Sequence, residues 1–335
     1  MANKISPGNL DTRTYNTTRG AKAWLEGGTQ GAALYRGPCT GLLRALPEAS
    51  VDLVVSSPPY CMGKEYEPGE KDVETFKTQH REILPLVIRT LKPGGSLCWQ
   101  VGYHVHRGVC TPLDYLILRE MEAFPDMVLR NRIAWTFGHG LHAMTRFSGR
   151  HETVLWFTKG HDYGFDLDAV RITQKYPGKL SSRGPNKGKP SGNPDGKNPG
   201  DVWDIPNVKA NHVEKTAHPC QFPVGLAQRF VRALTKPGDV VLDPFCGVAS
   251  SGVASVVEGR RFLGAEISAE YVRIAQERLE LAARGELSYR PADRAVHIPS
   301  VAQKVSQRPV GFAVPITPQT ASRVLKRNVS AAKRA

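Results

Sequence analysis

Two kinds of hydrophobic pattern alternate along the chain. Short apolar runs rich in β-branched residues, of which Val51 to Val55 is the clearest, are typical of strands buried on both faces. Other segments, such as residues 76–91, carry apolar residues three or four positions apart and predict amphipathic helices. Strands that alternate with helices in this way predict an α/β fold with a mostly parallel sheet.

The expected elements follow from these patterns and from the glycines and prolines between them. Strands are expected over residues 32–36, 51–57, 96–101, 127–137, 153–158, 240–242 and 261–265. Helices are expected over residues 40–46, 76–91 and 111–123, and again after Pro223, Gly247 and Glu266. Residues 127–137 and 153–158 have no helix between them, which favours an antiparallel pair. Residues 1–30 are polar without clear periodicity, so we expect a loose N-terminal arm.

The run Val51 to Val55 ends at Ser57-Pro58-Pro59-Tyr60, which predicts a rigid corner. Neither proline can continue a central strand, because each lacks an N–H group and has a fixed φ. The corner presents a hydroxyl, backbone carbonyls and an aromatic ring at the carboxyl end of a strand, where open α/β sheets bind ligands. Two acceptors there could hold an exocyclic amino group while Tyr60 stacks on its ring. A plain exit from a strand has the same pattern, so the corner alone leaves both interpretations open.

A second candidate site lies near the C-terminal end of the predicted core. The strand 240–242 ends at Asp243-Pro244-Phe245-Cys246-Gly247, small residues open a helix, and the next strand ends at Glu266. Such a βαβ unit lets the backbone approach a ligand beside a helix N-terminus, and the acid suits two ribose hydroxyls. No G-x-G-x-x-G is present, and Ala249 stands where a second glycine is usual. The pattern therefore favours an adenosine-bearing cofactor other than a dinucleotide.

The charge balance indicates a polyanionic partner. The formal net charge of the 335-residue chain is +14, and residues 171–200 are rich in Gly, Pro, Ser, Asn and Lys. We expect this stretch to contact DNA phosphates, although a disordered linker has the same composition. The candidate DNA-binding residues are Lys175, Lys179, Arg183, Lys187 and Lys189. Residues 301–335 contain no acid and predict a flexible basic tail.

The cysteine spacing and the lack of targeting segments indicate the expected metal content and cellular compartment. The six cysteines form no C-x-x-C pair, so no metal site is predicted and a reducing compartment is expected. No signal peptide and no apolar run of about 18 residues is found, which favours a cytoplasmic protein, nucleoid-associated through DNA, with no membrane contact.

Ser57-Pro58-Pro59-Tyr60 and Asp243-Pro244-Phe245-Cys246-Gly247 together resemble the amino-methyltransferases of DNA. The catalytic motif comes first and the cofactor motif last, with a basic region between them, as in the circularly permuted β class. His218 to Pro223 is similar to an additional cofactor-side motif of that family, and Arg150-His151-Glu152 before a Trp-Phe strand also resembles it. Two positions depart from the family: Gly37-Pro38 replaces a usual Gly-Asp, and Ala249 replaces a glycine.

The resemblance implies S-adenosyl-L-methionine as cofactor and methyl transfer to a base flipped out of double-stranded DNA. Ser57 and the Pro58 carbonyl would accept hydrogen bonds from the target amino group, and Tyr60 would stack on the base. The implied catalytic residues are Ser57, Pro58, Pro59 and Tyr60. The implied cofactor-binding residues are His218, Phe222, Asp243, Phe245, Cys246, Gly247, Glu266 and Ile267. Serine in the first motif position favours N4 of cytosine, and N6 of adenine is the alternative.

Other functions remain as alternatives. Pro219-Cys220-Gln221 imitates the nucleophile motif of cytosine-C5 methyltransferases, but the motif order is reversed and no Glu-Asn-Val follows. A protein-glutamine methyltransferase usually carries Asn before Pro-Pro-Tyr. A non-catalytic DNA-binding protein on a methyltransferase fold is the rival from another class.

The expected architecture is a Rossmann-like methyltransferase sheet, mostly parallel with one antiparallel strand, in permuted order with an inserted target-recognition region. The expected divisions are an arm (1–30), a catalytic half (31–160), a basic recognition region (161–215), a cofactor half (216–285) and a basic tail (286–335). A homodimer and a cognate restriction endonuclease are further partners that the sequence leaves open.

Overall fold

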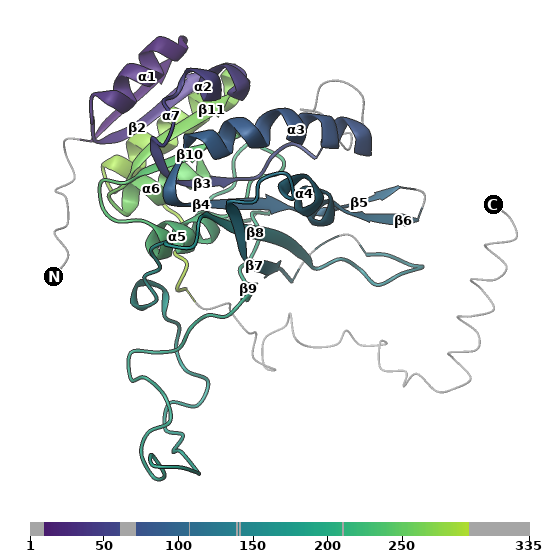
Figure 1. The fold of residues 1–335 in the computed structure, drawn as a ribbon, viewed down its shortest axis with the longest axis vertical. Helices are drawn as coiled ribbons and strands as arrows, with labels where there is room; N and C mark the ends of the chain where they lie inside the picture. Colours follow the sequence, from purple (N-terminus) through teal and green to yellow (C-terminus); the bar gives the residue numbers. More distant parts are fainter. Residues whose placement is uncertain are drawn as a thin grey trace, which may run out of the picture. The chain divides into compact units, whose positions relative to one another are not determined.

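The computed structural model describes residues 10–60, 72–106, 108–138, 140, 142–209 and 211–294. Their central feature is a nine-stranded sheet with the order β1-β2-β11-β10-β3-β4-β8-β7-β9 (Figure 1). Its strands are β1 Asp11–Tyr15, β2 Gly31–Arg36, β3 Val51–Ser56, β4 Leu91–Val101, β7 Met127–Thr136, β8 His151–Lys159, β9 Val202–Asp204, β10 Val240–Asp243 and β11 Arg261–Glu266. Of these strands β8 alone runs antiparallel to its neighbours, β4 and β7, which confirms the predicted sheet. A separate hairpin consists of β5 Tyr103–His106 and β6 Val109–Pro112.

Helices pack on both faces of the sheet. One core contains apolar side chains from α1 Thr18–Glu26, α2 Cys39–Ala45, α3 Val73–Thr90 and α4 Leu113–Met121. The other contains side chains from α5 Val224–Leu234, α6 Ser250–Val257 and α7 Ala269–Ala283. Strand residues alternate between the cores: Val54 packs in the first, and Leu53 and Val55 pack in the second. No helix among the described residues has both the length and the hydropathy needed to cross a membrane.

The prediction of a loose N-terminal arm is wrong for the described residues 10–30. β1 pairs in parallel with β2 as the edge strand of the sheet. In α1 the buried residues Ala21, Trp24 and Leu25 follow helical spacing, and the Arg261 guanidinium lies 4.9 Å from the centre of the Trp24 ring. The hydrophobic pattern of β1 was weak because this strand is polar and only partly buried, as an edge strand with one neighbour can be.

The predicted tail also needs a correction at its start. Part of residues 286–294 lies against α5 and the segment before it: the Ala292 N–H donates to Gln228 of α5 at 2.9 Å, and the Arg290 N–H donates to Glu214, which precedes α5, at 2.9 Å. Residues 61–70, whose two glycines and one proline predict a loop, and the predicted tail from residue 295 onward lie outside the described residues.

The basic insertion leaves the sheet at the edge opposite to the predicted catalytic corner. It follows β8, which runs antiparallel to β4, and it precedes β9, which runs parallel to β7. Both of its ends therefore lie where the parallel strands begin, whereas the corner lies where β3 ends. A bridge between Ile172 and Lys197 closes the base of the insertion, and the rest projects away from the helices and strands (Figure 1).

Candidate active site

The two predicted motifs meet at the carboxyl ends of neighbouring strands. β3 and β10 pair in parallel, so Ser56 and Asp243 lie side by side although 187 residues separate them. The Ser56 hydroxyl donates a 2.6 Å hydrogen bond to Asp243 Oδ1, and both side chains are fully buried. This contact fixes Ser57 to Tyr60 relative to the turn that follows Asp243.

Asp243 holds the second turn together from inside. Its carboxylate accepts hydrogen bonds from the hydroxyls of Ser56 and Ser251 and from the Phe245 N–H, the last at 3.0 Å. Burial raises the pKa of Asp243 to about 6, and the three hydrogen bonds oppose that rise. The carboxylate thus lies behind the turn, where it sets the shape of residues 244–251.

Two left-handed residues shape this turn. Gly247 has φ +52° and Ala249 has φ +58°, so Ala249 adopts the conformation for which glycine is the usual residue. The Gly247 N–H donates to Glu266 Oε2 at 3.1 Å, and the Ser268 N–H donates to Oε1 at 2.7 Å. Burial raises the pKa of Glu266 above its ordinary value. The turn and the acid at the end of β11 are therefore one hydrogen-bonded unit, as the spacing predicted.

His218 lies directly over Gly247. A Cβ atom at Gly247 would lie 3.1 Å from His218 Nε2, and the ring centre of His218 is 4.6 Å from that of Tyr271. Burial lowers the pKa of His218 to about 4, and the charges of Lys215 and Arg278 add to this effect. The Cys220 N–H donates to Nδ1 at 3.2 Å, which assigns the proton of the neutral ring to Nε2.

The other predicted cofactor residues divide between surface and core. Ile267, beside Glu266, is 69% exposed. Cys246 is buried, and burial raises the pKa of its thiol well above the ordinary value. Phe222 packs against the α5–α7 core, and Phe245 packs edge-on to Trp99 with a 6.2 Å separation of ring centres.

Tyr60 is fixed by two polar side chains from the adjoining strands. Its hydroxyl accepts a hydrogen bond from Gln100 Nε2 at 2.9 Å and lies 3.5 Å from Glu152 Oε2. Its ring edge rests on Gly102, where a Cβ atom would approach within 3.2 Å of Cε2. The ring is thereby held in one orientation beside Pro58, as a stacking surface requires.

Sequence patterns identified the corner and the acid but missed several residues that support them. The missed residues are Ser56, Ser251 and Gln100. Gln100 is a polar residue inside the apolar strand 96–101, which is a signal that could have been used. The predicted DNA-binding residues Lys175, Lys179, Arg183, Lys187 and Lys189 lie on the exposed insertion, and the structure does not bring them to the corner.

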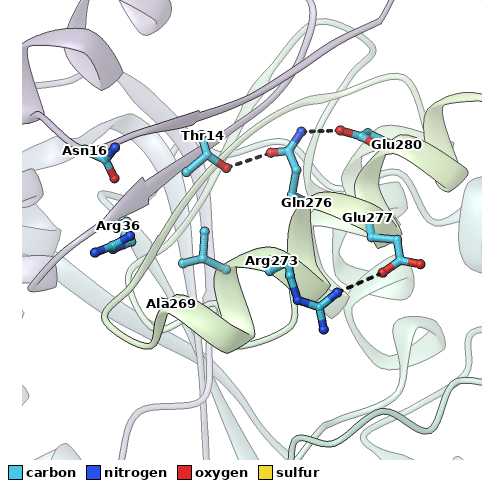
Figure 2. Close-up of a pocket in the computed structure, with 9 residues that line it drawn as sticks. Thr14, Asn16, Arg36, Ala269, Arg273, Gln276, Glu277 and Glu280 are labelled. Atoms are coloured by element: carbon cyan, nitrogen blue, oxygen red, sulfur yellow. Dashed lines mark hydrogen bonds and ion pairs between the residues drawn. The ribbon is translucent and has the colours of Figure 1, made fainter.

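A shallow cavity of about 470 Å³ lies beside this site, between α7 and the ends of β1 and β2 (Figure 2). Its polar side chains bind one another: Thr14 donates to Gln276 at 2.8 Å, and Gln276 donates to Glu280 at 2.8 Å. Arg36 lines the cavity and is the register partner of Glu266 on the neighbouring strand, but neither Glu266 nor Gly247 lines it. The cavity therefore adjoins the candidate site but is not lined by Glu266 or Gly247.

The sheet order and the two joined motifs define a Rossmann-like methyltransferase. The family model N6_N4_Mtase, described as DNA methylase, matches residues 51–277. The chain therefore belongs to this family of DNA methyltransferases.

Relatives support this assignment over most of the chain. The type II methyltransferase M.BglII of Bacillus subtilis is 45% identical over 73% of this chain and 68% of its own length. The DNA adenine methyltransferase YhdJ of Escherichia coli K12 is 30% identical over 76% of this chain and 85% of its own.

Solved structures agree on the fold. PvuII DNA methyltransferase, a cytosine-N4-specific enzyme, is 24% identical over 78% of this chain and 95% of its own, with a TM-score of 0.58. A DNA modification methylase of Thermus thermophilus, complexed with S-adenosyl-L-methionine, is 27% identical over 76% of this chain and 97% of its own, with a TM-score of 0.54.

S-adenosyl-L-methionine is accordingly the cofactor of this chain, and the residues present fit it. Glu266 offers a carboxylate for two ribose hydroxyls at the end of β11, beside the exposed apolar side chain of Ile267. At Gly247 the backbone approaches the His218 ring so closely that a Cβ atom would lie 3.1 Å from Nε2, which fits a turn built for close backbone approach to a ligand.

Proposed function

We propose that this DNA methyltransferase acts on the exocyclic N4 amino group of cytosine and belongs to the permuted β class. The observation that carries the proposal is the Ser56–Asp243 hydrogen bond, which joins the two motifs at one sheet edge. It places the Ser57–Tyr60 corner beside the turn that is hydrogen-bonded to Glu266. Serine at position 57 favours cytosine because, in the family that the motifs resemble, Ser-Pro-Pro-Tyr goes more often with N4 of cytosine than with N6 of adenine.

The corner would hold the target amino group for direct transfer. Ser57 Oγ and the Pro58 carbonyl accept its two hydrogens, which turns the nitrogen lone pair out of the ring plane. Tyr60, fixed by Gln100 and Glu152, stacks on the flipped base. When bound, S-adenosyl-L-methionine would supply an electrophilic methyl group: the bond from the methyl carbon to sulfur breaks as the bond to nitrogen forms, S-adenosyl-L-homocysteine leaves, and the nitrogen loses one proton. The rate enhancement would come from the alignment of the amino nitrogen with the methyl group and from hydrogen bonds that strengthen as the nitrogen gains positive charge.

Glu266 and Ile267 would hold the adenosine part of the cofactor, and Gly247 with Phe245 and Cys246 would line its methionine part. His218 would cover the turn from above, and Asp243 would act through the turn that it shapes. Phe222 would support this group from the core.

The recognition of DNA would involve the basic insertion as well as the corner. The insertion is exposed and rich in lysine, so it can follow phosphates at a distance from the target base. A cognate restriction endonuclease is a further partner that we propose from the type II relatives, and the homodimer stays a prediction.

Transfer to N6 of adenine is the second candidate, because one relative is named an adenine methyltransferase. The two acceptors at the corner suit either amino group. The decisive measurement is mass spectrometry of nucleosides from plasmid DNA incubated with the enzyme and its cofactor. We expect N4-methylcytosine; N6-methyladenine would overturn the base assignment, and no methylated base would favour a non-catalytic DNA-binding protein.

Ser57→Ala should lower turnover on the order of a hundredfold, because one acceptor for the reacting amino group is removed. Cofactor affinity, measured by calorimetry, should change less than about twofold. Cys220→Ala is the matched control, since this exposed thiol lies outside the proposed chemistry and its removal should leave turnover intact. An equal loss of turnover and cofactor affinity in Ser57→Ala would contradict the assigned role.

A further inference from the structure

Two hairpins project beside Tyr60 at the carboxyl edge of the sheet. One is β5–β6, which follows β4 directly, and the other is the tip between β7 and β8 (Figure 1). Residues 102–112 and 137–151 contain no Asp or Glu. The second of these segments carries Arg146 and Arg150. Two acid-free segments beside the corner suit the phosphates of a duplex whose base enters the site.

Packing contacts connect the second hairpin to the catalytic tyrosine. The Tyr60 ring rests on Gly102, and the next residue, Tyr103, lies so close to Gly149 that a Cβ atom there would overlap its hydroxyl. Ser148 Oγ accepts a hydrogen bond from the Ala143 N–H at 3.0 Å, which closes residues 143–148 on themselves. The base of the tip is therefore held against the elements that hold Tyr60.

The tip presents apolar side chains to solvent. Phe147 is 99% exposed and Met144 is 77% exposed. Arg146 lies between them and donates to the Phe147 carbonyl at 3.0 Å. Phe165, another exposed aromatic residue, stacks on Trp156 with ring centres 5.6 Å apart, whereas the Phe147 ring is open on nearly its whole surface. A fully exposed ring on a basic tip is suited to a contact made only in a complex.

We propose that Phe147 is the wedge that enters the DNA stack beside the flipped base, with Arg146 held near the adjoining phosphates. The inference rests on the proposed function and adds a residue that acts on the DNA outside the catalytic corner. Apolar side chains inserted between base steps unstack them and open the duplex. Phe147 precedes Glu152 by five residues, a reach of at most about 17 Å. That span equals about five base-pair steps of 3.4 Å, so Phe147 and the Ser57–Tyr60 corner can reach the same recognition site on the DNA.

The test compares Phe147→Ala with the parent enzyme on two duplexes that carry the recognition site, once sequencing of methylated plasmid DNA has located it. In one duplex the target base is correctly paired, and in the other it faces a mismatched base. We expect the transfer rate to fall at least about tenfold on the paired duplex and less than about threefold on the mismatched one, because a mismatched base costs less to unstack. Phe147→Trp should restore most of the rate.

A second measurement reports the opening of the duplex itself. With 2-aminopurine, paired with thymine, directly beside the target base, the parent enzyme should increase the probe's fluorescence by unstacking it, and Phe147→Ala should lose most of that increase. DNA affinity by anisotropy should change less than about threefold. Tyr115→Ala removes a 56% exposed ring from α4 and serves as the control, with no change expected in either measurement.

The outcomes separate this inference from the proposed function. A rate that is unchanged on the paired duplex, or that falls equally on both duplexes with an unchanged fluorescence response, would overturn the wedge. A parent enzyme that methylates no DNA would instead overturn the proposed function.

Discussion

At the scale of the residue, Asp243 shows how one buried group can organise a site that it does not line. Its carboxylate receives the hydroxyls of Ser56 and Ser251 and the Phe245 N–H, so the corner and the turn share one acceptor. Replacing a buried acceptor leaves its donors unsatisfied, which is costlier than the loss of an exposed bond. Replacing Asp243 should therefore disturb the geometry of both motifs together.

The raised pKa of Asp243 has a consequence for stability. Its pKa of about 6 in the folded chain exceeds the ordinary value of 3.8, so the folded state binds more protons between these pH values. The free energy of unfolding should therefore fall as pH rises from about 4 to 6, by on the order of 3 kcal/mol, and this contribution should be constant above. Asp243→Asn should remove this part of the slope in urea unfolding measured from pH 4 to 7. Parallel pH profiles for the two proteins would contradict the assignment.

Single-residue predictions succeeded where a backbone signal accompanied the side chain. Pro58 and Pro59 marked the corner, and the spacing from Gly247 to Glu266 marked the cofactor unit. Ser56 could not be identified in the same way, because its partner is 187 residues away and only the strand order brings them together.

At the scale of the element, β1 and α1 are the clearest difference between expectation and structure. The strands β3, β10 and β11 were predicted well because each is buried on both faces and reads as an apolar run. β1 pairs on one side only, so polar residues are tolerated there and the pattern carries little information. The arginine of β11 completes the packing: Arg261 donates to the Leu25 carbonyl at 2.7 Å and covers the Trp24 ring.

Trp24→Ala tests whether these N-terminal elements are integral to the fold. The ring is 4% exposed, so its removal should lower the free energy of unfolding by about 3–5 kcal/mol. Lys22→Ala on the solvent face of the same helix is the matched control and should change it by less than about 0.5 kcal/mol. A loss below about 1 kcal/mol for Trp24→Ala in chemical denaturation would show that α1 packs only loosely.

At the scale of the whole molecule, the lysine-rich insertion and the catalytic corner lie at opposite edges of the sheet. The net charge is +14, yet the lysine-rich insertion leaves the sheet at the edge away from Ser57. Its composition predicted a role in binding, but the edge from which it leaves depends on the direction of β8. The sequence predicted that β7 and β8 are antiparallel to each other, but not which of the two runs against the rest of the sheet.

Neutralising the insertion should therefore weaken DNA binding with little effect on turnover at saturating DNA. With Lys175, Lys179, Arg183, Lys187 and Lys189 all replaced by glutamine, the slope of log K against log salt should decrease by about 0.9 for each phosphate that the insertion no longer neutralises. The same substitution at Arg44, Arg81 and Arg119, which pair with glutamates on the helical surface, is the control. Equal slopes for the two variants in a salt titration would exclude phosphate binding by the insertion.

The position of β10 and β11 between β2 and β3 also affects how the chain is synthesised. A ribosome produces β2 and β3 long before residues 240–266, and until then each of these strands lacks the partner that covers one of its edges. Unpaired apolar edges are sites of aggregation. The nascent chain therefore passes through a long interval in which its most hydrophobic strands have incomplete pairing, and protection by chaperones matters most during that interval.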